Sequence, residues 1–247
     1  MSDARRLFVP ELTAAGGNVS LPLESVRHAQ VLRVRVGQHV CLFDAAGQQA
    51  DAHITRIERG RIMCEAGPAR ALPERASRLS LVLGVPKAPK LDGVVRMTTE
   101  LGVHALRLAH TEHSVPRLSA DSPKLERLRR VAREACAQSG QPRVPEVVAP
   151  EALVTVAAAA PKGALRVVFW EQSTASLDHV FPAPTFAACR DVWAVVGPEG
   201  GLGQDEVAAL TELGYRDVGL GDAILRVDTA VLVASTLLLD RMGLLGR

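Results

Sequence analysis

The stretch DVWAVVGPEGGL, residues 191–202, predicts how the carboxyl-terminal part of the chain folds. Its apolar run 192–196 has the length and composition of a buried β-strand. The strand must end in the glycines and proline of 197–201, which force a sharp turn. A helix is expected shortly afterwards, because Asp205 and Glu206 would place negative charge in its first turn. The stretch therefore predicts a strand, a tight glycine-rich turn and a helix.

A second stretch, DVGLGDAILRVDTAVLVAST at residues 217–236, repeats this pattern. Another short strand is expected to end at 218–221, in glycines. Asp228 or Thr229 should then cap a long apolar helix that runs to about Met242. Two glycine-rich strand ends side by side form a crevice at the carboxyl edge of a sheet, where open α/β folds place their ligands.

From residue 79 onward, expected strands and helices alternate, which is typical of an α/β domain with a largely parallel sheet. The further elements are strands over 79–85, 105–109 and 165–170 and helices over 89–101 and 123–138. The polar face of helix 123–138 is basic, and it is either a solvated face or an RNA contact. The loop at 171–174 should lie at the same sheet edge as the two glycine-rich turns.

The first seventy residues are mostly β in pattern. Short strands over 5–9, 19–21, 38–43, 49–57 and 61–65, with one helix over 24–32, suggest a small β-barrel. Residues 67–78 contain proline and charge without periodicity, so we expect domains over 1–70 and 79–247 with a linker at 71–78. Basic residues cluster around the one expected helix, as a phosphate-contacting patch or as a solvated basic face: Arg27, His28, Arg33 and Arg35.

Several kinds of chemistry are disfavoured by the sequence. It has no G-x-G-x-x-G after a strand, no phosphate-binding P-loop and no G-x-S-x-G. His110-Thr-Glu-His113 lacks the spacing of a metal-binding helix, so no metal is expected. The four cysteines show no C-x-x-C spacing, and no signal peptide precedes the first strand, so we expect reduced thiols in the cytoplasm. The net charge of +2 is too small to indicate a partner by itself.

The glycine-rich turn suits a neutral, backbone-rich ligand site. Glycines let main-chain groups approach a flat ring closely, and Leu220, Ile224 and Leu225 offer apolar walls. An adenine with a sulfonium tail fits this composition better than a polyphosphate, which would need lysine or arginine in the loop. The alternative is a tight turn without a ligand, and the neighbouring residues 220–229 favour the ligand.

Five ordered segments carry a family resemblance. GPEGG is followed by LG-x-x-ILR-x-D-T-A at 220–230 and preceded by HAQVLRVRVGQ at 28–38, ELGV at 100–103 and EACAQSGQPRVPEV at 134–147. In this order they cover nearly the whole chain. The chain resembles the RsmE family of SPOUT-class methyltransferases, which act on a uridine N3 of 16S ribosomal RNA.

The resemblance implies the architecture and the partners. We expect a PUA-like β-barrel that binds RNA, followed by a SPOUT-type α/β domain with a trefoil knot and a parallel sheet. The implied cofactor is S-adenosyl-L-methionine, the implied target is uridine 1498 of 16S ribosomal RNA, and the implied assembly is a homodimer. Alternatives are a SPOUT enzyme for another RNA position, such as a transfer RNA ribose, and a non-catalytic RNA-binding factor in ribosome assembly.

The expected site residues fall into two sets. The cofactor-binding set is Trp170, Glu171, Val196, Gly197, Pro198, Glu199, Gly200, Gly201, Leu220, Gly221, Ile224 and Leu225. The RNA-binding set is Arg5, Arg6, Arg27, His28, Arg33, Arg35 and Arg143.

Methylation of a uracil nitrogen requires loss of its imide proton, so the site must take up the proton or stabilise the anion. Arg226 is the expected stabiliser, because its guanidinium is always charged and offers several donors. Asp228 is expected to orient Arg226 or to take the proton, and its alternative role is the helix cap. Glu199 could instead accept backbone hydrogen bonds within its own turn.

Four positions depart from the family pattern. Asp222 stands where proline is common, Val227 where threonine is, Asp228 where glutamate is usual and His113 where arginine is frequent. Every glycine and Arg226 are retained, so cofactor binding is expected.

Overall fold

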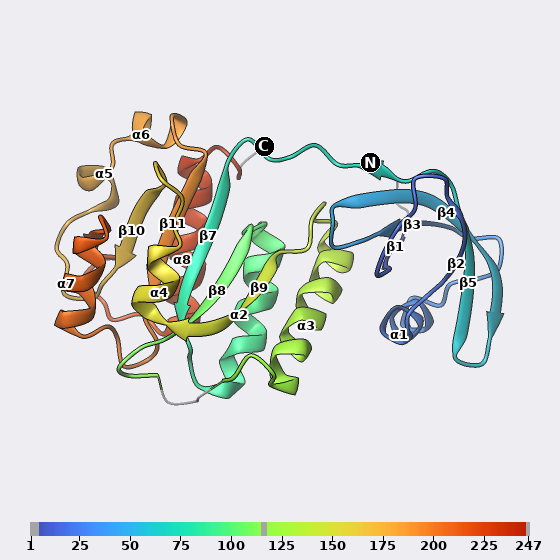
Figure 1. The fold of residues 1–247 in the computed structure, drawn as a ribbon, viewed down its shortest axis with the longest axis horizontal. Coiled ribbons are helices and arrows are strands. Elements are labelled where there is room, and N and C mark those ends of the chain that lie inside the picture. Colours follow the sequence, from blue (N-terminus) through green and yellow to red (C-terminus); the bar gives the residue numbers. More distant parts are fainter. Residues whose placement is uncertain (1–4, 115–117, 246–247) are drawn as a thin grey trace. The chain divides into compact units, whose positions relative to one another are not determined.

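The computed structural model describes residues 5–114 and 118–245. These residues form two compact units, and each is described by itself (Figure 1). The first unit runs to Glu74 and also contains Ala132–Val144, and the second contains Arg75–Val131 and the chain from Pro145 onward. The sequence-based limits assign all of 79–247 to one domain, and they do not anticipate that 132–144 belongs with the first unit.

The first unit is a six-stranded sheet in the order β1-β3-β4-β5-β2, with β6 paired to β4. Neighbouring strands are antiparallel except β1 and β3, which run parallel. Alternate side chains of β4 and β5 turn inward onto a core that includes Leu7, Val40 and Ile54. The elements are β1 (Arg5–Phe8), β2 (Gly17–Ser20), α1 (Leu23–Val31), β3 (His39–Phe43), β4 (Gln48–Glu58), β5 (Arg61–Ala66) and β6 (Arg70–Ala71). The expected strands and helix are present, whereas β6 is too short to show a periodicity.

The last turns of α3 (Pro123–Ser139) complete this first unit. Arg133 donates from Nε and Nη2 to the two carboxylate oxygens of Glu24, at 2.7 and 2.9 Å. The same guanidinium lies 5.1 Å from the centroid of the Phe8 ring. A bidentate pair that also stacks on an aromatic ring is geometrically specific. It ties α1 and β1 to residues about a hundred positions later in the chain, which accounts for their grouping.

The second unit is a six-stranded sheet in the order β12-β10-β11-β7-β8-β9, and every neighbouring pair is parallel. This confirms the expected parallel α/β sheet. Its strands are β7 (Arg78–Gly84), β8 (Ala105–His110), β9 (Glu146–Ala152), β10 (Leu165–Phe169), β11 (Asp191–Val196) and β12 (Arg216–Val218). The central strands β7 and β11 are buried along nearly their whole length, which explains their unbroken apolar sequence.

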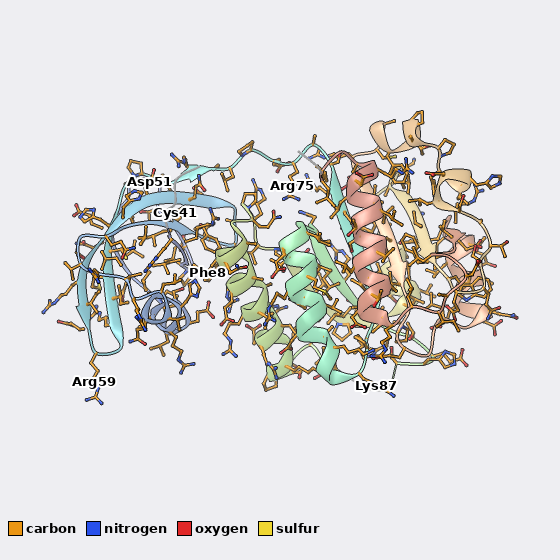
Figure 2. All side chains as sticks on the ribbon, turned by 180° about the vertical axis from the view of Figure 1, so that it is seen from behind. Phe8, Cys41, Asp51, Arg59, Arg75 and Lys87 are labelled. Atoms are coloured by element: carbon orange, nitrogen blue, oxygen red, sulfur yellow. The ribbon has the colours of Figure 1, made fainter. Side chains whose placement is uncertain are left out.

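Helices cover both faces of this sheet. α2 (Ala88–Leu101) and α8 (Val227–Arg241) pack together on the face seen in Figure 2, and α4 (Leu153–Ala158) and α7 (Gln204–Glu212) lie on the face seen in Figure 1. Two short helices, α5 (Leu177–Val180) and α6 (Ala183–Ala187), precede β11. Gly102 ends α2 in the left-handed conformation, with φ of 84°.

The start of α8 differs from the expectation. The helix begins at Val227, so its N-cap is Arg226, and no side chain caps it. The expected cap by Asp228 or Thr229 is therefore wrong. Both residues already lie in the first helical turn, where the Asp228 carboxylate interacts favourably with the helix dipole without closing a cap.

Four other elements, β9, α4, α5 and α6, are absent from the sequence-based expectation because they are short or carry no clear apolar period. The trefoil knot that the resemblance implies stays a prediction. In the described part of the chain, no helix is long and apolar enough to cross a membrane.

Candidate functional site

Three loops meet at the carboxyl edge of the parallel sheet. β10 lies between β11 and β12 and runs parallel to both, so their carboxyl ends are adjacent. The loops that leave these three ends, together with the first turns of α8, enclose a cavity of about 300 Å³. This volume is at the lower end of the range of small-molecule sites.

All twelve residues of the expected cofactor-binding set line this cavity. Four further residues line it that were not expected: Phe169, Asp222, Ala223 and Ala230. The first three are sequence neighbours of expected residues, so extending each loop would have found them. Ala230 comes from the helix, and its place could not be seen without the packing of α8. The contacts of these residues with a ligand stay a prediction.

Close backbone approaches hold the glycine-rich loop in place. A Cβ at Gly84, the last residue of β7, would lie 2.5 Å from Pro198 Cδ, so this glycine lets the loop rest on the strand end. A Cβ at Gly200 would lie 2.6 Å from the Cβ of His113. The absent side chain of Gly200 thus makes room for the loop after β8, whereas the sequence suggests that it makes room for a ligand ring.

Side-chain hydrogen bonds fix the loops further. Trp170 Nε1 donates to the carbonyl of Leu202 at 3.2 Å. Glu206 accepts from the backbone N–H groups of Glu112 at 2.9 Å and Gly203 at 3.0 Å, so it ties the β8 loop to the start of α7. The cavity is therefore formed by loops that are cross-linked to one another, which favours a preorganised site.

Glu199 makes its hydrogen bonds outside its own turn. Its carboxylate oxygens accept from the backbone N–H of Lys87 at 3.2 and 3.1 Å. Lys87 is the N-cap residue of α2 and lies at the edge of the unit in Figure 2. The carboxylate thus occupies the positive end of that helix, where negative charge is stabilised.

One ammonium group lies between two carboxylates. Lys90 Nζ is 3.7 Å from Glu199 Oε1 and 3.6 Å from Asp228 Oδ1. Arg226 is exposed, and within residues 5–114 and 118–245 no ion pair joins it to Asp228. The structure therefore brings Asp228 to Lys90, where the sequence suggests a partnership with Arg226.

A second, open hollow of about 410 Å³ adjoins the cavity and shares Glu199 and Gly200 with it. Its other lining residues are Lys87, Glu112, His113 and Ser114. The described residues contain no group of three or more His, Cys, Asp or Glu that could hold a metal ion.

The expected RNA-binding set divides into two groups. Arg27, Arg33 and Arg35 are exposed on α1 and the turn that follows it. Arg33 adopts a positive φ of 51°, uncommon for a residue with a side chain. His28 is half-buried. Burial lowers the pKa of its imidazole, and the negative charge of Glu134 raises that pKa by a smaller amount. At neutral pH this favours the uncharged ring.

The remaining three arginines bind carbonyl groups of the first unit. Arg5 donates to the carbonyl of Leu32 and Arg6 to that of Gln141. Arg143 donates to Leu72 at 2.5 Å and to Ala46 at 3.4 Å. Their guanidinium groups serve the fold of the unit, so they are weaker candidates for RNA contact than the exposed three.

Known proteins resemble the chain along most of its length. A family model described as an RNA methyltransferase domain matches residues 73–239, and one described as an RNA methyltransferase PUA domain matches residues 22–65. Proteins named ribosomal RNA small subunit methyltransferase E are 29% identical to it in Mycobacterium tuberculosis and Bacillus subtilis. The alignments cover 85% and 87% of this chain and 81% and 87% of those proteins.

The solved structures agree. The protein of that same name from Neisseria gonorrhoeae, crystallised with S-adenosyl methionine, has a TM-score of 0.84 and 28% identity, over 96% of this chain and 97% of that one. A structure described as a probable rRNA-methyltransferase from Porphyromonas gingivalis has a TM-score of 0.80 and 25% identity, over 97% and 98%.

Filling the cavity tests whether it is a ligand site. Ala230→Trp would place an indole in the roughly 300 Å³ space, so S-adenosylmethionine affinity should fall at least about a hundredfold. Isothermal titration calorimetry measures the decrease. The control is Ala208→Trp on the exposed face of α7, which should bind normally. Unchanged affinity in an Ala230→Trp protein with native circular dichroism would exclude this cavity.

Proposed function

The chain belongs to the RNA methyltransferase family, and on that basis we propose that it methylates N3 of a uridine in 16S ribosomal RNA, with S-adenosylmethionine as methyl donor. The small-subunit substrate is suggested by the names of the relatives, and the uridine, position 1498, by the resemblance of the motifs. The observation that carries the proposal is the cavity at the ends of β10, β11 and β12, lined by the residues of the motifs.

The lining of the cavity supports a ligand of this kind. Glycine backbone and the apolar side chains of Leu220, Ile224 and Leu225 suit an adenine ring. The charged residues of the lining are all acidic: Glu171, Glu199 and Asp222. A sulfonium cation is favoured by such a lining and a polyphosphate is disfavoured. When bound, the cofactor would supply an electrophilic methyl group.

Arg226 is the proposed catalytic cation. It stands at the N-cap of α8, one residue beyond the cavity-lining Leu225, and it is exposed. A guanidinium next to a uracil ring would stabilise the negative charge that builds up when the imide proton leaves. Asp228 Oδ1 lies 3.6 Å from the Lys90 ammonium, and this ion pair joins the start of α8 to α2. We therefore assign Asp228 a positioning part in the site, with the imide proton passing to solvent.

The exposed arginines Arg27, Arg33 and Arg35 are the proposed phosphate contacts. We also propose a homodimer, because Ile224 at the cavity is 89% exposed and α8 leaves Leu232 and Leu237 more than a third exposed. An isologous contact through these side chains would cover them and close the cavity. A ribosomal RNA substrate and four free cysteines are consistent with the cytoplasm as the place of action.

Replacing Arg226 tests catalysis directly. Arg226→Ala should lower the single-turnover rate at saturating RNA and cofactor by about a hundredfold or more, the usual effect of removing one preorganised donor. Cofactor affinity should change little, and Arg226→Lys should rescue poorly, because one ammonium cannot reproduce a planar fork. An unchanged rate with weaker RNA binding would make Arg226 a phosphate anchor. Mass spectrometry of the methylated nucleoside separates uridine N3 from another position, and no methylation of any RNA would indicate an assembly factor.

The salt dependence of RNA binding tests the docking patch formed by the three exposed arginines. In an Arg27→Ala, Arg33→Ala, Arg35→Ala variant, the slope of log affinity against log salt should flatten by about 0.7–0.9 for each phosphate that an arginine neutralises in the wild type. The control variant removes three exposed arginines of the β4–β5 hairpin, Arg56, Arg59 and Arg61, and should keep the slope. Equal slopes in the docking-patch variant and wild type would show that those arginines are solvated and do not contact RNA phosphates.

The assembly is tested by placing charge on α8. Leu232→Glu combined with Leu237→Glu should convert a dimer into a monomer, because two carboxylates per subunit would have to be buried in the contact. Multi-angle light scattering measures the mass, with Ala208→Glu on α7 as the control. A monomeric, active wild-type protein would reject the dimer.

A further inference from the structure

Lys90 is a cation at the N-terminal end of a helix, where positive charge is unfavourable. It lies in the first turn of α2, three residues after the N-cap Lys87, and that turn contains no acidic residue. Positive charge at a helix N-terminus is unfavourable because it opposes the helix dipole. The side chain is also only 30% exposed, so water does not fully solvate the ammonium. A residue that breaks a local rule in this way needs an interaction that offsets the cost.

The two carboxylates near Lys90 supply that interaction, and they come from different elements. Glu199 belongs to the loop after β11, and Asp228 belongs to the first turn of α8. Asp228 Oδ1 is shielded from solvent, and within the described part of the chain it accepts no hydrogen bond. The Lys90 ammonium, 3.6 Å away, is its ionic partner. Lys90 therefore connects the glycine-rich loop with the start of α8.

The connection bears on Arg226, which stands two residues before Asp228 at the N-cap of the same helix. An Asp228 carboxylate without Lys90 would have the Arg226 guanidinium as its nearest cation in sequence. A pair between them would neutralise the charge that the substrate anion needs. We infer that Lys90 is a positioning residue that holds Asp228 away from Arg226 and so keeps the guanidinium available to the substrate.

The charges around Lys90 are consistent with this positioning role. Lys90, Glu199 and Asp228 together carry one net negative charge, and Arg226 brings the sum to zero. Lys87 adds a further cation at the neighbouring hollow, and its backbone N–H holds Glu199. Without Lys90, two carboxylates would compete for the remaining cations, and Asp228 is the one on the same helical turn as Arg226. The inference rests on the proposed role of Arg226, so its test includes a measurement that needs no turnover.

The first measurement is kinetic. Lys90→Met should lower the single-turnover rate at saturating RNA and cofactor by about tenfold, less than the removal of Arg226 itself, with cofactor affinity within about threefold of wild type. Adding Asp228→Asn to Lys90→Met should restore the rate to that of Asp228→Asn alone, because the competing carboxylate is then gone. Lys90→Arg keeps a cation at this position and should show the wild-type rate. The control is Lys124→Met, which removes a lysine from the first turn of another helix, α3.

The second measurement is nitrogen-15 NMR of the Arg226 Nε–H group in the protein without RNA or cofactor, assigned by its absence in Arg226→Lys. The group should be mobile in wild type and in the double variant and ordered in Lys90→Met. If the proteins show this pattern but wild type methylates no RNA, the proposed function fails and the positioning role stands. A mobile Arg226 in Lys90→Met, or a double variant slower than Asp228→Asn alone, would overturn the inference.

Discussion

The parallel pairing of β10 with β11 on one side and β12 on the other is the constraint on which the site depends. Residues from the three segments are far apart in the chain, and only a shared direction of the strands brings their carboxyl ends together. The cavity is therefore a property of the order of the strands. The side chains of the loops then decide what the cavity accepts, and in this chain they are apolar and acidic.

Carboxylates at the positive ends of helices organise the loops around that cavity. Glu206 joins the loop after β8 to the start of α7, and Glu199 joins the glycine-rich loop to the start of α2. Each side chain satisfies backbone N–H groups that a helix or loop leaves unpaired, which stabilises the loop and the helix end together. Glu199 also lines the cavity, so its negative charge contributes to the field there. Stability and ligand preference are thus linked through the same few residues.

The sequence predicts those features of the fold and the site that depend on neighbouring residues in the chain. The strand at 192–196 could be predicted because a buried parallel strand is continuously apolar. The expected helix 89–101 ends where expected because Gly102 adopts the positive φ that favours a helix end. The lining of the cavity followed from the motifs. The partner of Asp228 could not be predicted, because Lys90 lies on a helix far away in the sequence, and nothing local favours a lysine there. The cap of α8 was assigned wrongly, because two polar residues in a row fit the cap pattern and only backbone angles show which is already helical.

The grouping of Ala132–Val144 with the first unit has a consequence for synthesis of the chain. Arg133 holds Glu24, and Arg143 holds the carbonyls of Ala46 and Leu72, so the sheet that is made first lacks these braces until the chain has grown beyond Val144. By then β7, α2 and β8 have also been made. The amino-terminal unit cannot be completed by a contiguous fragment that ends at the boundary between the sheets. A ribosome making this protein must therefore begin the second unit before the first can finish folding.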